Sequence, residues 1–449
     1  MGKQLFGTDG IRGVAGEYPL DAATVYAFGV ALADDALLHR EGGESPRILI
    51  GMDTRESGSW IAGTVAGGLA SRGVQCDFAG VITTPGVAYL TRRGPYAAGV
   101  MISASHNPFQ DNGLKVFGHS GFKLPDSEEH EIENEILRLR EAGLTPQSVE
   151  LKTDESLDGQ YVEYLLSTVN ARFDGMRIVA DCGNGAAYAL APKLLRELGA
   201  EVIVLNAAPD GRNINLNCGA LHVERLRDAV IANQAGFGVA FDGDADRAIF
   251  VARSGKIVDG DAVLLMAGRT LRATGKLPGD TVVATVMSNL GLERALAASG
   301  IRMTRTPVGD KYVLEEMVRL DAALGGEQSG HVIFREFATT GDGLLTALRV
   351  FEIAKLAGKG LDELTADLQV YPQRLVNIRV REKKGLLERP AVADEIRRVE
   401  EAFGSAGRVL VRFSGTEPLA RVMVEGPDLA QVERFSASIA EVIRQEIGE

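Results

Sequence analysis

The chain has 449 residues, which at roughly 100 to 200 residues per domain allows two to four domains. Hydrophobic residues make up 45% of the chain and charged residues 24%, a globular balance that excludes a largely disordered protein. The net charge of −13 argues against a nucleic-acid partner, and no apolar run approaches the roughly 20 residues of a membrane span.

From residue 46 to about 350, short apolar runs alternate with segments of helical period, as in strand–helix–strand units around mixed, mostly parallel sheets. This pattern predicts the α/β class. The predicted strands are Arg47–Gly51, Ala97–Ile102, Met176–Ala180, Val202–Leu205, Gly238–Phe241, Thr281–Thr285 and Ala322–Gly325. The predicted helices are Gly58–Ser71, Ser127–Glu141, Ala187–Leu198, Leu221–Asn233, Asp261–Thr274 and Asp342–Leu356.

The pattern changes after residue 370 and predicts a smaller α+β domain at the C-terminus. Its elements are an alternating run Arg374–Arg381, a helix near 386–403, strands Arg408–Phe413 and Leu419–Glu425, and a final helix from Asp428. Polar connecting stretches separate the parts of the chain. They predict domains at 1–155, 156–254, 255–368 and 369–449.

Three of the predicted strands end in polar loops at comparable spacing, which suggests three similar units in tandem. The loops are Ser103–Pro108, Asp242–Arg247 and Gly326–His331. Ligands of open α/β sheets bind beyond the carboxyl ends of the strands. Three such loops that face one crevice would therefore build a single site from three domains.

The first of these loops carries a candidate phosphoryl acceptor, Ser105, followed by His106, Asn107 and Pro108. A polar residue followed by proline is a common start of a helix, and the free amides of a first turn favour an anion. Ser105 could therefore accept a phosphoryl group, with His106 hydrogen-bonded to it. A simple helix cap is the alternative.

The second loop presents three alternating carboxylates, Asp242, Asp244 and Asp246. Carboxylates this close repel one another unless a cation lies among them, and hard oxygen ligands suit Mg²⁺. An EF-hand is excluded because Arg247 and Arg253 occupy the positions of its required glycine and glutamate. The alternative to a magnesium site is a solvated acidic turn.

The third loop places Glu327, Ser329 and His331 between glycines, which fits hydrogen bonding to a polyhydroxylated ligand. An ordinary turn with a core histidine is the alternative. Two cations elsewhere could serve as counter-charges: Arg12 lies in the stretch Phe6–Gly13 with its three glycines, and Lys115 follows the serine loop closely. Each could equally be a surface cation.

The last domain contains a loop that could bind phosphate between two strands. Ser414, Gly415 and Thr416 offer hydroxyls and successive amides, with Arg412 before them and Arg421 after them. A plain hairpin turn is the alternative.

Taken together and in this order, these four loops resemble the α-D-phosphohexomutase family over nearly the whole chain. The stretch Phe6–Gly13, Gln328 and the stretch Thr339–Gly343 are most like the bacterial subgroup that acts on glucosamine phosphates. Phe413 departs from that subgroup, which usually has proline at this place.

The resemblance implies an isomerase with four domains around a central cleft. It would interconvert glucosamine 6-phosphate and glucosamine 1-phosphate through a phosphoserine and a glucosamine 1,6-bisphosphate intermediate. This reaction would supply UDP-N-acetylglucosamine and cell-wall synthesis.

The resemblance also implies roles for the residues of the loops. Ser105 would carry the phosphate and, with Asp242, Asp244 and Asp246, bind one Mg²⁺ per chain. Glu327 and Ser329 would bind sugar hydroxyls. The phosphate that is not transferred would be held by Arg412, Ser414, Gly415, Thr416 and Arg421.

Further catalytic groups would surround the serine. Arg12, Arg247 and Lys115 would provide positive charge, and His106 would orient the phosphoserine. Lys115 or His331 would be the general base, a choice that the sequence leaves open.

Three alternatives remain at the level of the sequence. The first is activity on glucose or mannose phosphates within the same family. The second is a magnesium-dependent phosphatase with an aspartate nucleophile, disfavoured because Ala245 and not a hydroxyl residue follows the second aspartate. The third is a sugar-phosphate-binding module without catalysis.

The cysteines and the N-terminus bear on location and assembly. Cys76, Cys182 and Cys218 form no Cys-x-x-Cys pair, and the N-terminus lacks a signal-type apolar core. We therefore expect a soluble cytoplasmic protein with neither a nucleic-acid nor a membrane partner. The segment Gly58–Ser71 could offer the surface of a homodimer, or else face the core.

Overall fold

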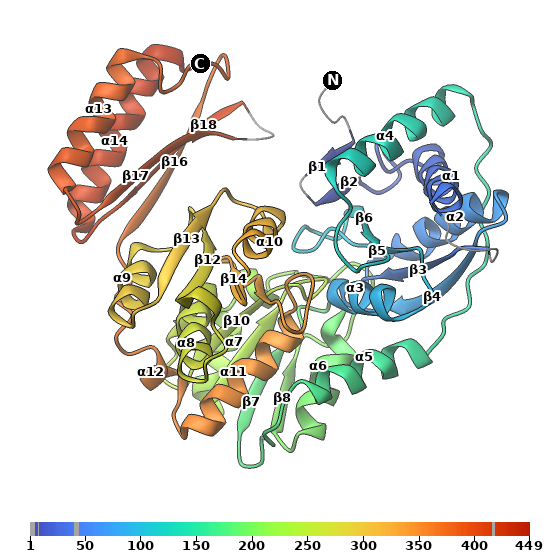
Figure 1. The fold of residues 1–449 in the computed structure, drawn as a ribbon, viewed down its shortest axis with the longest axis horizontal. Coiled ribbons are helices and arrows are strands. Elements are labelled where there is room, and N and C mark those ends of the chain that lie inside the picture. The colour runs from blue at the N-terminus through green and yellow to red at the C-terminus, as the bar shows by residue number, and fades with distance from the viewer. Residues whose placement is uncertain (1–4, 8, 40–44, 415–417) are drawn as a thin grey trace. The chain divides into compact units, whose positions relative to one another are not determined.

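A computed structural model describes residues 5–7, 9–39, 45–414 and 418–449. The chain forms two compact units: unit 1 comprises residues up to 286 and 303–365, and unit 2 comprises 287–302 and 366–449. Within the described residues, unit 1 contains three sheets and unit 2 contains one (Figure 1). In the same residues, no helix combines the length and apolar character needed to cross a membrane.

The first sheet of unit 1 has the order β1-β2-β6-β5-β3-β4. Pairing is parallel between β4, β3 and β5, and antiparallel from β5 through β6 and β2 to β1. The strands are β1 (Phe6–Gly7), β2 (Gly10–Val14), β3 (Arg47–Met52), β4 (Gln75–Val81), β5 (Ala98–Ile102) and β6 (Asp111–Gly118).

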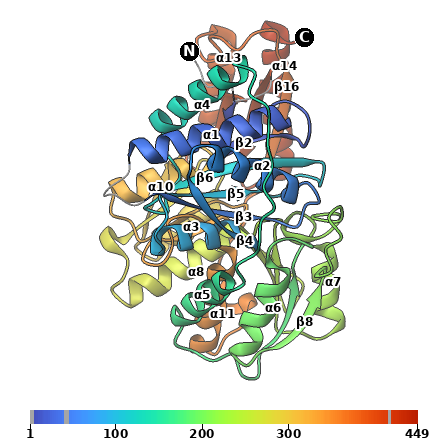
Figure 2. The same cartoon turned by 90° about the vertical axis from the view of Figure 1, so that its right-hand side faces the viewer.

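Helices cover this sheet, and α1 packs against both α2 and α4 (Figure 2). Their bounds are α1 (Ala22–Leu38), α2 (Gly58–Ser71), α3 (Thr84–Arg93) and α4 (Asp126–Glu141). The core between them joins inward residues of the strands, such as Ile48, Ile50 and Val100, to apolar residues of the helices, such as Phe28 and Ile61. This packing fixes the sheet whose strand ends carry the first loop.

The second sheet has the order β11-β10-β9-β7-β8, and the third has the order β13-β12-β14-β15. The second contains β7 (Arg177–Asp181), β8 (Glu201–Leu205), β9 (Phe237–Phe241), β10 (Ala248–Ala252) and β11 (Ile257–Val258), with α5 (Ser156–Ser167), α6 (Ala187–Glu197) and α7 (Glu224–Ala232). The third contains β12 (Thr281–Thr285), β13 (Arg302–Thr306), β14 (Leu324–Gly326) and β15 (Val332–Phe334), with α8 (Gly260–Ala273), α10 (Asp310–Arg319), α11 (Gly343–Ala357) and α12 (Leu361–Leu364).

The three predicted loops occupy equivalent places in these sheets. In each case a strand with a parallel neighbour (β5, β9 or β14) leads through the loop into an antiparallel partner (β6, β10 or β15). This confirms the prediction of similar α/β units with mixed sheets. The repeated connection explains why equivalent loops reach the same end of their sheets.

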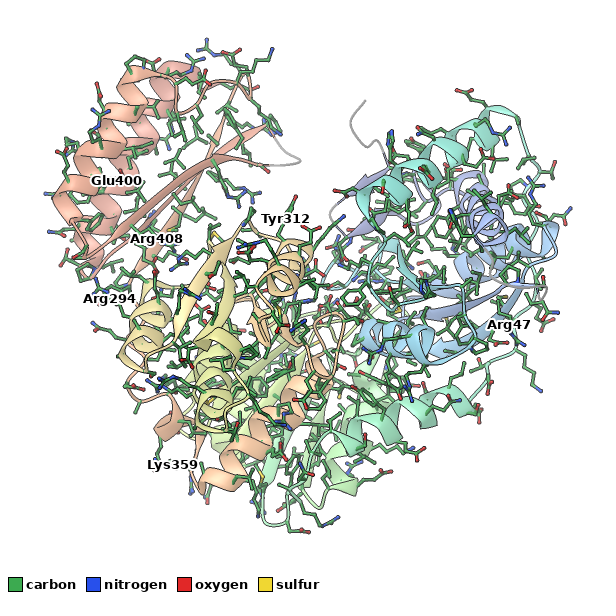
Figure 3. The ribbon with its side chains drawn as sticks, viewed as in Figure 1. Arg47, Arg294, Tyr312, Lys359, Glu400 and Arg408 are labelled. Carbon is green, nitrogen blue, oxygen red and sulfur yellow. The ribbon has the colours of Figure 1, made fainter. Side chains whose placement is uncertain are left out.

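Unit 2 contains an antiparallel sheet of order β16-β18-β17, covered by α13 and α14 (Figure 1). The elements are β16 (Gln373–Arg379), β17 (Arg408–Phe413), β18 (Leu419–Glu425), α13 (Pro390–Phe403), α14 (Leu429–Ile447) and α9 (Leu290–Ala298). Arg294 of α9 donates to Ser405 O at 2.7 Å, and Arg408 of β17 donates to Ser288 O at 3.0 Å; Figure 3 labels both arginines. These bonds tie the 287–302 segment into unit 2.

The predicted elements are present, with shifts at some ends. Helix α7 begins at Glu224 because Gly219–Leu221 forms a separate 3-10 turn. The sequence left two alternatives open for the segment Gly58–Ser71, an exposed surface or a core-facing helix. Most of α2 is buried, since it packs against α1 and its Gly63 O accepts from Val149 N at 3.0 Å. The core-facing alternative is therefore the correct one for this helix.

Candidate active site

The serine loop follows β5 but does not open a helix, so that prediction is wrong. The chain turns at 105–110 and returns as β6, antiparallel to β5. The turn is held by two residues that follow β3: Asp53 accepts from Ser103 Oγ at 2.5 Å, and Arg55 bonds the turn's carbonyls. Arg55 donates to the carbonyls of Ser105 (2.8 Å), Asn107 (3.0 Å) and Pro108 (2.6 Å). These carbonyls therefore converge on a guanidinium and cannot align along a helix axis.

The side chain of Ser105 is buried and lies against the acidic loop. Its backbone is left-handed, with φ of +52°, and its Oγ donates to Asp242 Oδ2 at 2.6 Å. The same Oγ lies 3.3 Å from Nδ1 of His106, which accepts from Arg247 Nη1 at 3.2 Å. Burial, together with the charges of Arg247 and Arg12, lowers the pKa of His106 to about 4. His106 is therefore neutral near pH 7.

The acidic loop brings Asp242, Asp244 and Asp246 together after β9. One carboxylate oxygen from each lies within 4.8 Å of the others, and all three residues are buried. Gly243 touches the serine loop so closely that a Cβ on it would lie 2.4 Å from Ser105 O. Burial and the charges of Asp246 and Asp244 raise the pKa of Asp242 well above its ordinary value. The three carboxylates thus repel one another.

The donor set of this triad fits a metal ion. Oδ1 of Asp244 and Oδ1 of Asp246 are buried and accept no hydrogen bond from any described residue. A buried acceptor without a donor is costly, and a cation would satisfy both oxygens and relieve the repulsion. The buried triad could therefore hold a metal ion, and hard carboxylate oxygens favour a hard divalent ion.

Lys115, on β6, is a buried cation beside the triad. Its Nζ lies 2.8 Å from Asp244 Oδ2, 2.9 Å from Asp9 Oδ2 and 3.7 Å from Asp246 Oδ2. Burial opposes the charge, but Asp244, Asp9 and Asp246 outweigh it and raise the pKa of Lys115 well above its ordinary value. Lys115 is therefore protonated in this arrangement.

Two arginines border the serine and the triad. Arg12 pairs with Asp9 and donates from Nη1 to Ala104 O at 3.4 Å. Arg247 donates its backbone N–H to Asp242 Oδ1 at 3.1 Å, and its side chain reaches His106. Burial opposes the charge of Arg247, but Asp246 and Asp242 raise its pKa above the ordinary value. Both predicted cations thus lie beside the serine loop.

The third loop brings His331 to the triad. His331 is buried, with Nδ1 at 3.7 Å from Asp246 Oδ2, and its Nε2 accepts from Gly341 N at 2.9 Å. Burial lowers the pKa of His331, but Asp246 and the more distant carboxylates raise it overall. Since Nε2 accepts a backbone N–H, the proton of the neutral ring lies on Nδ1, facing Asp246.

The other two residues of this loop are more open. Glu327 is half-buried and its Oε1 accepts from Gly309 N at 3.1 Å, whereas Ser329 is exposed. The three predicted loops therefore meet at the acidic loop. The serine loop contacts it through Ser105 and Asp242, and the third loop contacts it through His331 and Asp246.

Several residues of the site were missed from the sequence. They are Asp53, Arg55, Thr84, Lys123, Asn215 and Asp310. Asp53 and Arg55 follow the predicted strand 47–51 as the other loops follow theirs, so the same rule could have found them. Thr84 pairs with Asp244, and Asn215 donates to Ser105 O at 2.9 Å; no local pattern marks either residue.

The predicted phosphate loop lies in unit 2. Arg412 and Arg421 are direct cross-strand partners on β17 and β18, and Ser414 is buried with its N–H donating to Leu419 O at 2.8 Å. Burial and the charge of Arg421 lower the pKa of Arg412. Like charges placed directly opposite are unfavourable, and an anion such as phosphate would relieve them. Gly415 and Thr416 lie outside the described residues.

Comparison with known families matches four models in the order of the chain. The model for phosphoglucomutase/phosphomannomutase alpha/beta/alpha domain I matches residues 3–143, and domain II matches 159–255. Domain III matches 259–371, and the C-terminal domain of the same family matches 375–442.

Similar proteins and a similar structure agree with these matches. A phosphoglucosamine mutase of Solibacter usitatus is 73% identical over 449 residues, which is 100% of both chains. One of Koribacter versatilis is 51% identical, covering 99% of this chain and 98% of its own. The crystal structure of a phosphoglucomutase/phosphomannomutase family protein from Burkholderia thailandensis has a TM-score of 0.80 at 24% identity, covering 98% and 97% of the two chains.

Proposed function

The chain belongs to the phosphoglucomutase/phosphomannomutase family, an isomerase family, and on this basis we propose that it interconverts glucosamine 6-phosphate and glucosamine 1-phosphate. The high identity to phosphoglucosamine mutases along the full chain supports the choice of an amino sugar. The observation that carries the chemistry is the contact of Ser105 Oγ with Asp242 at 2.6 Å, which puts a buried serine against the acidic triad.

In the proposed reaction, Ser105 carries the phosphoryl group that is transferred. The bond between Ser105 Oγ and phosphorus breaks as the free hydroxyl of glucosamine 6-phosphate bonds to phosphorus and gives its proton to a base. The product is glucosamine 1,6-bisphosphate. This intermediate turns end for end and returns its 6-phosphoryl group to Ser105, which releases glucosamine 1-phosphate for UDP-N-acetylglucosamine and cell-wall synthesis.

Asp242, Asp244 and Asp246, together with an oxygen on Ser105, would hold one Mg²⁺ per chain. The ion would neutralise charge on the transferring phosphoryl group. The chain itself supplies further positive charge from Arg12 and Arg247, which both contact the serine loop. His106, neutral and 3.3 Å from Ser105 Oγ, orients the phosphoserine.

We assign the role of general base to Lys115 in preference to His331. His331 accepts the Gly341 N–H on Nε2 and faces Asp246 with Nδ1, so it has no free nitrogen for a sugar hydroxyl in this geometry. Lys115 owes its high pKa to carboxylates that include Asp244 and Asp246. A cation bound by these carboxylates would cancel part of their charge and ease the loss of a proton from Lys115.

The end-for-end turn requires one reactive and one passive phosphate position. Glu327 and Ser329 would hold sugar hydroxyls. The passive phosphate would bind to the loop of unit 2, through Arg412, Ser414, Gly415, Thr416 and Arg421. The cross-strand pairing of two arginines supports this assignment.

The first test compares kcat/KM for glucosamine 6-phosphate with the values for glucose and mannose phosphates. Phosphorylated enzyme is assayed with Mg²⁺ and a trace of the matching 1,6-bisphosphate. We expect a strong preference for the amino sugar. Equal or better turnover of glucose or mannose phosphates would refute the proposed amino-sugar substrate, while the proposed serine mechanism would still stand.

The second test is Ser105→Ala, which removes the phosphoryl acceptor. Turnover should be nearly abolished while the thermal unfolding curve stays close to that of the wild type. Intact-mass spectrometry should find a phosphoryl group on the wild type and none on the variant. Wild-type turnover by Ser105→Ala would refute the phosphoserine mechanism.

A further inference from the structure

Ionisable side chains around the site form a closed ring in which carboxylates alternate with basic side chains. Starting from the serine sheet, its members are Lys115, Asp9, Lys123, Asp310, His331 and Asp246. Lys123 Nζ lies 2.5 Å from Asp9 Oδ1 and also pairs with Asp310, whose Oδ2 lies 3.7 Å from His331 Nε2. Lys115, His331 and Asp246 belong to the active site described above. The Lys123–Asp310 pair completes the ring between Asp9 and His331.

The Lys123–Asp310 pair joins two separate sheets of unit 1. Lys123 lies in the turn between β6 and α4, where it bridges to Phe117 of the first sheet. Asp310 is the first residue of α10, which a short turn connects to β13 of the third sheet. The pair therefore connects the sheet that carries Ser105 with the sheet that carries the sugar loop.

The turn that contains Asp310 holds the sugar loop at two points. The N–H of Gly309 donates to Glu327 Oε1 at 3.1 Å, and the next residue, Asp310, faces His331. Any movement of this turn would displace both side chains of the loop together. Lys123 binds the carboxylate of Asp310 in this turn from the first sheet.

The Lys123–Asp310 ion pair lies in a largely buried environment. The side chains of Lys123 and Asp310 are 13% and 15% exposed. Burial opposes the charge of Lys123, but Asp310 and Asp9 outweigh it and raise its pKa above the ordinary value. Removing Lys123 would take this cation away from the buried carboxylate of Asp310, and the loss of a partner in a buried pair is costly.

We propose that Lys123 and Asp310 are positioning residues that fix Glu327 and His331 against the phosphoserine loop. This inference rests on the proposed function, because it assigns a task in the same reaction. Neither residue needs to touch the sugar. Their task is to keep the sugar loop in register with Ser105 while the intermediate leaves one orientation and takes up the other.

A second ion pair on the same helix provides a matched control. Lys311, next to Asp310 on α10, pairs with Asp126 of α4 at 2.7 Å, so it also links the third sheet's helix to the first sheet's helix. Asp126 is 71% exposed, and neither residue belongs to the ring. If the Lys123–Asp310 pair served only to hold the two parts together, Lys311–Asp126 would serve equally.

The experiment measures kcat and KM for Asp310→Asn, Lys123→Gln, the double variant, Lys123→Arg and Lys311→Gln in the full chain with Mg²⁺. Rates are expressed per phosphorylated Ser105, so that misfolded protein does not count. A misplacement of about 1 Å can cost about 100-fold in rate, so we expect each single variant to lose about 10- to 100-fold in kcat, with a smaller change in KM.

The remaining variants distinguish a positioning role from a purely structural one. The double variant should be no worse than the more impaired single variant, because both singles remove the same interaction. Lys123→Arg keeps the charge and should recover most of the rate. Lys311→Gln should stay within twofold of the wild type.

Two results would overturn the proposal: kcat within twofold of wild type in both Asp310→Asn and Lys123→Gln, or an equal loss in Lys311→Gln. The variants are compared on the sugar phosphate that the wild type converts fastest. A wild type that prefers glucose or mannose phosphates would therefore refute the proposed substrate and still test the role of the pair.

Discussion

At the scale of single residues, Gly341 shows how tightly the site is packed. Its N–H donates to His331 Nε2 at 2.9 Å, and a Cβ at this position would lie 2.4 Å from the same nitrogen. Gly341→Ala must therefore shift the imidazole from its observed position. We expect kcat to fall at least about tenfold, since small displacements at a reacting centre cost that much. Steady-state kinetics with the amino-sugar phosphate checks this.

The matched control for that substitution is Gly159→Ala. Gly159 lies in α5, is exposed, and has open space where a Cβ would be placed. Alanine in a helix is better than glycine by up to about 1 kcal/mol, so this variant should keep its activity and gain slightly in stability. Full activity in Gly341→Ala would show that His331 does not need its observed position.

Residues that carry distinctive chemistry could be predicted from the sequence, and residues that act through distant partners could not. Asp242, Asp244 and Asp246 are recognisable because they repel one another within one loop and follow an apolar strand. Lys123 and Asp310 have no such local signal, because they are 187 positions apart and meet only after two sheets pack.

At the scale of elements, the start of α11 couples stability to pH. Asp342 is buried at the N-cap, where it accepts from Leu345 N at 2.9 Å and from Tyr161 Oη at 2.7 Å. Burial raises its pKa from the ordinary 3.8 to about 6, against the effect of these donors. The native state therefore binds the proton more tightly than the unfolded state, and stability falls as pH rises from about 4 to about 6.

Asp342→Asn should remove this dependence, since asparagine is also a good N-cap and cannot ionise. The variant should be more stable than the wild type at pH 7, by about 3 kcal/mol at most, and the difference should vanish towards pH 4. Thermal unfolding at several pH values measures it.

The control for that pH series is Asp428→Asn. Asp428 caps α14 in the same way, accepting from Gln431 N at 2.7 Å, but it is exposed. Its difference from the wild type measures what the exchange of aspartate for asparagine does at an exposed helix cap. A pH-independent difference for Asp342→Asn would show that burial does not perturb this carboxyl group.

The sequence predicted helices and strands well where the apolar period was regular. It failed at the serine loop, where Asn107-Pro108 is typical of a helix start. Tertiary hydrogen bonds from Arg55 to three carbonyls override that local preference. It also left α2 undecided, because a helix rich in small residues packs closely on a neighbour, and the same residues give no strong polar face.

At the scale of the whole molecule, the two units should respond differently to a divalent ion. Each has its own hydrophobic core, and the acidic triad lies in unit 1. We expect calorimetry to resolve two transitions, of which Mg²⁺ raises only that of unit 1. At a concentration 100 times Kd the gain is about 2.7 kcal/mol, and a chelator should reverse it.

Asp244→Asn provides the control, because it removes one ligand charge and should abolish the shift. A shift of the unit 2 transition, or a full shift in Asp244→Asn, would place the ion elsewhere. Activity should follow the same titration, falling on chelation and recovering with added Mg²⁺.

The domain boundaries predicted from the sequence remain predictions. The four family matches follow the same order, but the contact pattern groups the first three sheets into unit 1 and assigns residues 287–302 to unit 2. Local polarity marks where a connection is exposed. It cannot reveal that a short segment leaves one unit to pack with another, as α9 does.

The assignment of residues 287–302 to unit 2 determines how the two units can be expressed as separate fragments. A fragment that starts at residue 366 would leave behind Asn289, whose side chain exchanges hydrogen bonds of 3.0 and 2.9 Å with the backbone of Tyr371. An excised unit 2 should therefore carry 287–302 fused ahead of it.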